Sequence, residues 1–226
     1  MSFLSAPVTR FSTIVLFILL MSLPSFAANC GVGKVILQDN FTLLSPVWGL
    51  TPGPDFVTGP DGLVVTMKPK AFLFGLNQSG FFGDYEVCMT VKINYKCTDP
   101  KNCEASPTVG LTFWGEDKFN YYVCDITPPY SSYGVIRLQK NKTLTLVHAA
   151  YLPENAIPKM MQDFIDVSVA VKGNHMICKV NGIVAAELDG LPPDGGSLFG
   201  FQLYSSDEDT EGSKFVVKKI EVRELQ

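Results

Sequence analysis

Residues 109–126 constrain the fold of this chain more than any other stretch. Two runs in which apolar residues alternate with others, VGLTFW and YYVCDI, flank the short polar connection GEDKFN. Such alternation is typical of half-buried β-strands, and a short connection containing Gly joins them as an antiparallel hairpin. We expect the apolar row to face a core: Leu111, Phe113, Tyr122, Cys124 and Ile126. The opposite row then leaves three side chains on the free face of the sheet: Trp114, Tyr121 and Asp125.

Similar runs recur along the chain, separated by turn residues. We expect strands at residues 34–41, 63–67, 71–74, 85–93, 134–139, 143–148, 165–171, 175–180, 183–188, 198–204 and 215–221. Asn181-Gly182 is the strongest hairpin signal, because a type I′ turn needs positive φ at both central positions. Residues 44–62, rich in Pro and Gly, indicate a covering loop that carries Trp48, and residues 160–164 are the one helical suggestion. The pattern predicts one all-β domain, a two-sheet antiparallel sandwich.

The beginning of the chain has the pattern of a secretory signal peptide. Arg10 is the only charge before Lys34, residues 11–23 are almost wholly apolar, and Ser25-Phe26-Ala27 offers small residues at the usual cleavage spacing. The uninterrupted apolar core, residues 14–21, is far shorter than the roughly 20 residues that span a bilayer. We expect a signal peptide at 1–27 and a mature domain at 28–226, secreted or periplasmic. A retained membrane anchor and a lipid-anchored Cys30 are the alternatives.

An even number of cysteines in an exported protein favours disulfides over metal ligation. The chain has six, and Cys97 and Cys103 flank a short polar insert, where they can pair without disturbing the strands. Cys88 points away from the core, which makes a bridge to Cys30 plausible. Cys124 and Cys178 are left on core-facing rows and could cross the sandwich. Six cysteines allow many pairings, so only the Cys97–Cys103 bridge is predicted specifically.

Charge and composition exclude some partners. A formal net charge of −4 gives no electrostatic support for binding nucleic acid or an anionic membrane. The acidic run Asp207-Glu-Asp209 with Glu211 offers calcium-type oxygen ligands, but its spacing is not that of an EF-hand, and a solvated loop is favoured. No other cofactor or metal is indicated. Acceptor triplets for N-glycosylation begin at Asn40, Asn77 and Asn141.

Several motifs together resemble a known fold family. They are FGDYEV at 82–87, VGLTFW at 109–114 followed by Asp117 and NYY at 120–122, VNG at 180–182 and GGSLFGF at 195–201. In this order they resemble the concanavalin A-like jelly rolls of the laminin-G type, and more narrowly the bacterial 3-keto-disaccharide hydrolase family, which is glycoside hydrolase-like. The resemblance covers essentially the whole mature chain. It implies a two-sheet jelly roll that binds or processes glycans on the concave sheet or its rim, with calcium in some members.

The chain departs from the glycosidase pattern that this fold often carries. Glycoside hydrolysis generally uses two opposed carboxylates, supplied in these folds by Glu-x-Asp-x-x-Glu or a near variant. The nearest match is Glu187-Leu-Asp189, and its third acid falls at Pro192. His148 and His175, the only histidines, form neither a three-histidine metal site nor a serine triad with a nucleophile elbow. We therefore expect a solvated acid pair on this strand and lean against an enzyme, without excluding one.

The free face of the central sheet is the better candidate site. The same alternation places Arg137 and Gln139 opposite Ile136 and Leu138, and it places Gln202 and Tyr204 opposite their apolar neighbours. The expected ligand-binding set is Trp114, Tyr121, Asp125, Arg137, Gln202 and Tyr204. Sugar rings stack their C–H faces on aromatic side chains, while their hydroxyls need placed polar partners. We therefore predict an exported carbohydrate-binding protein. The alternatives are a hydrolase or lyase for 3-keto-sugars or other glycans, a structural or adhesive envelope protein, and a face that binds nothing.

Overall fold

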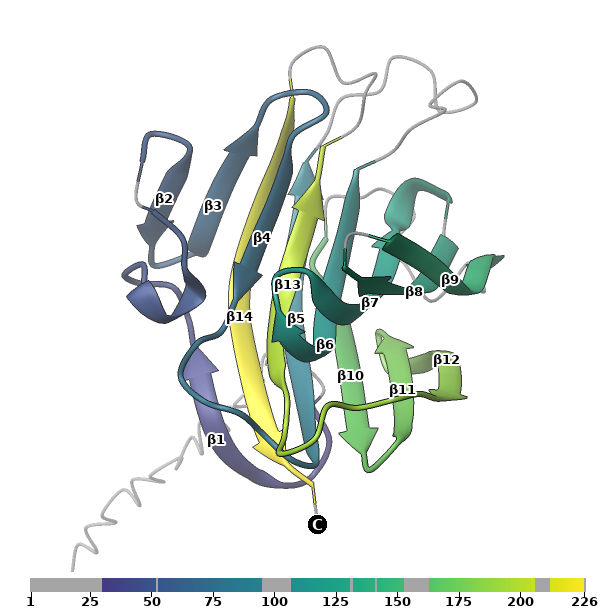
Figure 1. Cartoon of the computed structure of the whole chain (residues 1–226). Helices are drawn as coiled ribbons and strands as arrows, with labels where there is room; N and C mark the ends of the chain where they lie inside the picture. The colour runs from purple at the N-terminus through teal and green to yellow at the C-terminus, as the bar shows by residue number, and fades with distance from the viewer. Residues whose placement is uncertain are drawn as a thin grey trace, which may run out of the picture.

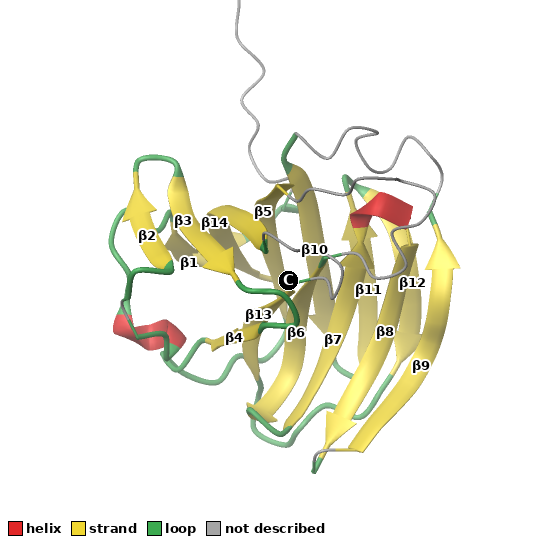
Figure 2. Ribbon diagram, turned by 90° about the horizontal axis from the view of Figure 1, so that it is seen from above, coloured by secondary structure: helices red, strands yellow, loops and turns green. Residues whose placement is uncertain are grey.

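The alternating runs form the strands of two facing antiparallel sheets (Figures 1 and 2). The structure is a computed structural model, and it describes residues 30–51, 53–94, 107–130, 132–140, 142–152, 163–205 and 212–225. Several predictions lie outside these residues: the signal peptide with its cleavage after Ala27, the Cys97–Cys103 bridge, the acidic run at 207–211, Asn141, and most of the helical suggestion. They remain predictions.

The larger sheet has eight strands in the order β12-β11-β10-β5-β14-β3-β2, with β1 also paired to β14. Its strands are β1 (Lys34–Asp39), β2 (Phe56–Gly59), β3 (Gly62–Met67), β5 (Tyr85–Asn94), β10 (Ile165–Lys172), β11 (His175–Val180), β12 (Ile183–Asp189) and β14 (Ser213–Glu224). All of these pairings are antiparallel. The turn between β11 and β12 has positive φ at both Asn181 and Gly182, as its sequence predicts.

The smaller sheet has six strands in the order β4-β13-β6-β7-β8-β9. Its strands are β4 (Phe72–Leu76), β6 (Thr108–Asp117), β7 (Asn120–Thr127), β8 (Ser132–Gln139), β9 (Lys142–Tyr151) and β13 (Leu198–Tyr204). The described residues also form two short 3-10 helices, η1 (Pro46–Trp48) and η2 (Pro128–Tyr130). Every predicted strand is confirmed, while β2 is an additional strand inside the stretch expected to be a loop.

The core lies between the inner faces of the two sheets. The predicted inward row of the β6–β7 hairpin is confirmed, since all five of its members belong to the buried hydrophobic cluster: Leu111, Phe113, Tyr122, Cys124 and Ile126. They meet inward rows from the larger sheet, such as Val87, Met89 and Val91 on β5. This buried apolar area is the main stabilising contribution to the fold.

The stretch that carries Trp48 covers the core, not the outer face of a sheet. η1 lies beside β4 (Figure 2), and the Trp48 indole is buried against Phe41, Phe199 and Phe201, with ring centroids 5.5–6.1 Å away. Its Nε1 donates a hydrogen bond of 2.7 Å to Asp39 Oδ2. The indole therefore closes the edge of the sandwich, and its only buried polar atom is paired.

Two disulfides join elements that are distant in sequence. Cys124–Cys178 links β7 in the smaller sheet to β11 in the larger one, so it crosses the core. Cys30–Cys88 fastens the N-terminal segment onto the outer face of β5. Both pairs match the pairings that the sequence left open, and two disulfides indicate folding in an oxidising environment. Within the described ranges, no helix is long and apolar enough to cross a membrane.

Candidate functional site

Trp114 is not on the outer face of the smaller sheet, so this part of the predicted site is wrong. The β6–β7 register breaks between Phe113 and Asp117, and the pairing of β13 with β6 shifts at the same level. Trp114 takes the left-handed conformation, with φ of 45°, and its side chain is 3% exposed within the core cluster. A β-bulge inserts an extra residue and reverses the alternation that follows it. The indole consequently packs on Phe113 and Tyr122, at 5.3 and 5.2 Å between ring centroids.

The predicted phase of β8 is also wrong, and this displaces Arg137. Tyr122 pairs directly with Arg137, while Tyr121 pairs with Leu138. Directly paired residues share a face, so Arg137 lies on the inner side and Leu138 on the outer side. The Arg137 guanidinium carbon lies 5.2 Å from the Tyr122 ring centroid, a cation–π contact. The adjacent apolar residues Val135 and Ile136 allow either phase, and the buried Val135 is the one that faces the core.

The other four predicted residues do share the outer face: Tyr121, Asp125, Gln202 and Tyr204. Gly110 pairs with Asp125 on one side and with Gln202 on the other. Across this glycine, Gln202 Nε2 donates a hydrogen bond of 2.6 Å to Asp125 Oδ1. A Cβ at Gly110 would lie only 2.3 Å from that oxygen. Gly110 therefore makes room for the bridge between its two neighbours.

The Asp125–Gln202 pair is electrostatically unusual. Burial raises the pKa of Asp125 to about 7, although the hydrogen bond from Gln202 opposes the shift. Burial, together with the charge of Asp125, raises the pKa of Tyr121 to about 12. Near neutral pH the Tyr121 hydroxyl is therefore protonated, whereas the Asp125 carboxyl group titrates in this range.

An aromatic row that the sequence prediction missed crosses the outer face. Phe72 and Phe74 of β4 pair with Tyr204 and Gln202 of β13, which places them on this side. Phe72 and Phe74 stack at 6.5 Å, and Phe74 stacks on Tyr121 at 4.8 Å. Phe72 is 54% exposed, whereas Tyr121 is only 7% exposed. The row thus presents Phe72 and Phe74 to solvent, with Tyr121 as their support. The alternation in Ala71-Phe-Leu-Phe74 was the available signal.

A groove of about 370 Å³ continues from this row, and we call it the β4 groove. It is lined by Trp48, Gly49, Phe74, Leu76, Gln78, Glu116, Asp117, Lys118 and Leu198. The side chains of Gln78, Glu116 and Lys118 are exposed at its rim. Asp117 stabilises the β6–β7 hairpin turn, because its Oδ1 accepts hydrogen bonds from the Phe119 N–H at 2.6 Å and from Asn120 Nδ2 at 3.0 Å. The groove thus combines apolar lining with amide, acidic and basic groups, a composition typical of small-molecule sites.

The expected acid pair on β12 is exposed, as predicted, and a histidine joins it. On β11, His175 Nδ1 lies 2.8 Å from Asp189 Oδ1, and its Nε2 lies 3.0 Å from Glu187 Oε1. Hydrogen bonds from the imidazole to Asp189 and then to Glu187 raise the pKa of His175. The cluster lies on the larger sheet, apart from the aromatic row. The other histidine, His148, belongs to β9, but its side chain is not described.

The described residues give little support for a metal ion. Cys30, Glu86 and Cys88 are the one group of three potential ligands in this part of the chain whose ligand atoms lie close together. The two sulfurs are joined in a disulfide, and Glu86 Oε2 accepts the Gly31 N–H at 2.6 Å. A disulfide sulfur is not a thiolate ligand. The calcium alternative concerned a different place, the acidic run, and stays untested.

One of the matches to a glycosylation acceptor lies at a buried asparagine. Asn77 is fully buried, and its Oδ1 accepts hydrogen bonds from the Ser79 backbone N–H at 2.9 Å and from the Ser79 hydroxyl at 2.5 Å. A glycan needs an exposed asparagine. Asn40, by contrast, is exposed.

Comparison with known proteins supports the fold. No protein-family model matches the chain, and no curated protein sequence matches it. The catalytic domain of an endo-1,3-beta-glucanase (laminarinase) from Thermotoga petrophila is similar over 86% of this chain and 99% of its own, with a TM-score of 0.60 and 12% identity. A beta-glucanase of Bacillus licheniformis is similar over 86% and 100%, with a TM-score of 0.58 and 6% identity.

A third similar structure is a protein of unknown function with a galectin-like fold from Bacillus subtilis. It covers 85% of this chain and 96% of its own, with a TM-score of 0.57 and 12% identity. The two antiparallel sheets, together with the similarity to these solved structures, identify the fold. The chain is a concanavalin A-like jelly roll. Identities this low establish the architecture of the jelly roll alone, and the narrower resemblance to 3-keto-disaccharide hydrolases stays a prediction.

Proposed function

We propose that this jelly roll is an exported protein that binds carbohydrate on the outer face of its smaller sheet. The observation that carries the proposal is the continuity of the Phe72–Phe74 row with the β4 groove, since Phe74 belongs to both. Two similar structures are glucanases by their names, which is consistent with a glycan ligand. The two disulfides are consistent with export.

The chemistry of the groove suits a neutral glycan. One sugar ring stacks on the exposed Phe72 and contacts the partly exposed Phe74, and neighbouring hydroxyls bond to Gln78, Glu116 and Lys118. Because two acids, Glu116 and Asp117, stand beside one base, Lys118, the described lining lacks the positive excess that a polyanionic glycan requires. Tyr121 stacks on Phe74, and the Asp125–Gln202 hydrogen bond joins the neighbouring strands, contacts that fix these side chains before a ligand binds and so lower the entropic cost of binding.

The proposed activity is binding without hydrolysis. Glu116 and Asp117 are the acids that line the groove, and they are adjacent in sequence, with Asp117 holding the hairpin turn. A glycosidase needs two carboxylates on opposite sides of the scissile bond. The groove does not supply this pair from its described residues. Turnover of a 3-keto-disaccharide or another glycan would replace this proposal by the enzymatic alternative.

The experiment is a calorimetric titration of the purified protein with neutral and acidic oligosaccharides of several linkage types. The Phe74→Ala variant should weaken binding of any ligand found by more than tenfold, because it removes the ring shared by the row and the groove. Phe81→Ala is the matched control, since Phe81 is an exposed aromatic residue that lines neither the groove nor the row.

Equal loss of affinity in both variants, or none in either, would place the ligand elsewhere. Absence of binding to every oligosaccharide would overturn the proposal. Capture of a protein partner that persists after glycan removal would instead support the structural or adhesive alternative.

A further inference from the structure

Trp114 holds a backbone conformation that bulky residues rarely adopt. Its positive φ is sterically unfavourable, and strain of this kind persists only where the surroundings impose it, often at binding sites. Its backbone N–H donates to the buried Tyr85 hydroxyl, which also lies 3.2 Å from Ser197 Oγ. The indole packs so closely on Gly190 that a Cβ there would lie 2.3 Å from Cζ3. These contacts therefore determine the position of the Trp114 side chain.

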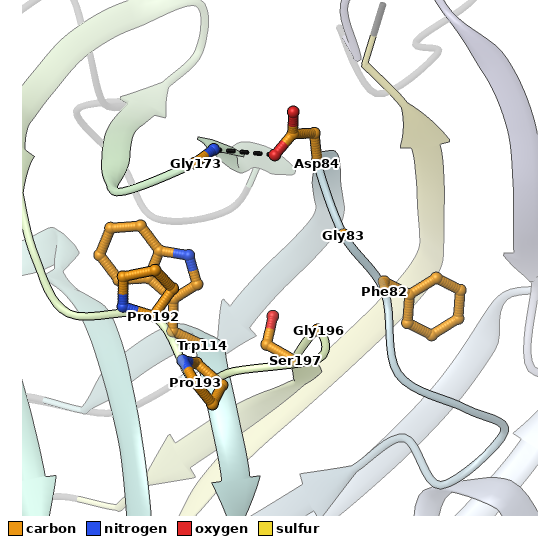
Figure 3. A pocket seen from close by; sticks show the side chains of 9 residues that line it. All are labelled: Phe82, Gly83, Asp84, Trp114, Gly173, Pro192, Pro193, Gly196 and Ser197. Carbon is orange, nitrogen blue, oxygen red and sulfur yellow. Dashed lines mark hydrogen bonds between the residues drawn. The ribbon is translucent and has the colours of Figure 1, made fainter.

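The indole borders a second cavity, of about 170 Å³, away from the β4 groove (Figure 3). It is lined by Phe82, Gly83, Asp84, Trp114, Gly173, Pro192, Pro193, Gly196 and Ser197. These residues come from the segment just before β5, the β10–β11 turn, the bulge in β6 and the connection from β12 to β13. We call it the end cavity. None of its lining residues belongs to the β4 groove.

The polar groups of the end cavity lie on opposite sides of it. In Figure 3 the nitrogen-bearing edge of the Trp114 indole faces the segment before β5 that carries Gly83 and Asp84. Asp84 Oδ1 accepts the Gly173 N–H at 2.8 Å, which fixes the carboxylate. Pro192 and Pro193 supply apolar surface, the Phe82 ring points away from the cavity, and the glycines expose their backbone to it (Figure 3). The cavity thus offers an N–H donor, a carboxylate acceptor and apolar walls.

We propose that the end cavity binds a single neutral sugar ring, independently of the glycan site proposed in the β4 groove. Its volume is below the roughly 300–1,000 Å³ of sites for drug-sized ligands, so it takes one ring and not a chain. One sugar hydroxyl accepts from the indole N–H and others donate to Asp84, while the C–H surface contacts the prolines. Sugars present such donors, acceptors and apolar surface together.

Charge and ring orientation exclude the main competing ligands. Among the described residues, Asp84 is the one charged group that lines the cavity, so an acidic sugar or another anion meets repulsion. A quaternary ammonium group binds the negative face of an aromatic ring, whereas Trp114 turns an edge of its ring toward Asp84. The edge of an aromatic ring is its positive part. A neutral polyol is therefore favoured over both ions.

The test is an NMR titration of the ¹⁵N-labelled protein with D-glucose, D-galactose and N-acetyl-D-glucosamine, and separately with D-glucuronate and choline. Trp48 and Trp114 are the only two tryptophans, and Trp114→Phe identifies their indole signals. At least one neutral sugar should shift the Trp114 indole and the Gly83 and Gly173 amides, with the Trp48 indole unmoved. Trp114→Phe keeps a ring but removes the donor, and it should weaken that binding about tenfold by the amide signals.

The Asp84→Asn variant tests the charge argument, because its side-chain oxygen can still accept the Gly173 N–H. It should bring glucuronate affinity to within a few-fold of that for the neutral sugar. Phe74→Ala, which alters only the groove, should leave the end-cavity shifts unchanged. Shifts with choline alone, no shift with any neutral sugar, loss of the shifts in Phe74→Ala, or unchanged discrimination in Asp84→Asn would each overturn the proposal. A melting curve of each variant shows that it is folded.

Discussion

Gly110 is the residue through which the architecture of the outer face can be tested most sharply. The structure has Asp125 and Gln202 bridging over it from the two neighbouring strands. In Gly110→Ala the new Cβ would lie 2.3 Å from Asp125 Oδ1, 2.6 Å from Val123 Cγ2 and 3.1 Å from Gln202 Cγ. The first two distances are shorter than real Cβ contacts, so the side chains must move and the bridge must break.

The expected cost follows from two effects. Overpacking a close-packed region costs about 1–3 kcal/mol, and loss of a hydrogen bond to a charged group costs about 1.5–3 kcal/mol. Against these, replacing Gly by Ala lowers the entropy of the unfolded chain and returns about 0.4–1 kcal/mol. We expect the free energy of unfolding to fall by roughly 2–4 kcal/mol. For a domain of this size, each kcal/mol shifts Tm by about 2–4 °C, so Tm should fall by roughly 4–15 °C.

Thermal and denaturant unfolding of Gly110→Ala beside Gly59→Ala is the appropriate assay. Gly59, at the end of the edge strand β2, has open space where a Cβ would be, so its substitution should change stability by less than about 1 kcal/mol. If Gly110→Ala melts together with Gly59→Ala, the Asp125–Gln202 bridge does not cross Gly110, and the register of β6 with its neighbours would have to be different.

Three further predictions concern charge, covalent links and the bulge. Burial raises the pKa of Asp125 to about 7, so the folded state holds this proton more tightly than the unfolded state does. The free energy of unfolding should therefore fall by up to about 4 kcal/mol as pH rises from about 4 to 7. Denaturant unfolding at several pH values should show a flatter slope for Asp125→Asn. A pH profile unchanged by the substitution would contradict the raised pKa. Replacing Cys124 and Cys178 together by Ala removes a cross-link between residues 54 apart in the sequence. The free energy of unfolding, measured with denaturant, should fall by roughly 4 kcal/mol because the unfolded chain gains entropy. Retained stability would show that the bond contributes little. Because its indole is buried, Trp114→Ala should cost about 3–5 kcal/mol, and a loss below about 1 kcal/mol in the melting curve would place Trp114 on the surface after all.

Sequence reasoning predicted the architecture well because its signals are local. Alternation of period two identifies a half-buried strand without knowledge of its partner, and Asn181-Gly182 specifies its turn through the backbone alone. The inward row from Leu111 to Ile126 follows in the same way. The sequence also left the Cys30–Cys88 and Cys124–Cys178 pairings open as plausible ones, and both are present.

The candidate site was only partly predictable, because the face on which a side chain lies depends on which of the two alternating rows of its strand points toward the core. Four of the six proposed residues share the outer face, but the bulge at Trp114 and the adjacent apolar pair Val135-Ile136 each admit a slip of one residue. A slip of one residue moves every following side chain to the opposite face of the sheet. Local sequence does not show where a bulge forms, since the pairing of β6 with both neighbours determines it.

The sequence by itself therefore determined that the chain forms an antiparallel sandwich, which residues make its strands and which hairpins connect them. Only the tertiary structure decided which aromatic side chains meet. Phe74 and Tyr121 stack although they are distant in the chain, because the order β4-β13-β6-β7 brings their strands into one sheet. The Trp114 indole lines the end cavity because distant turns close around it. Strand order and loop closure arise from burial of the whole core, and no short stretch of sequence encodes them.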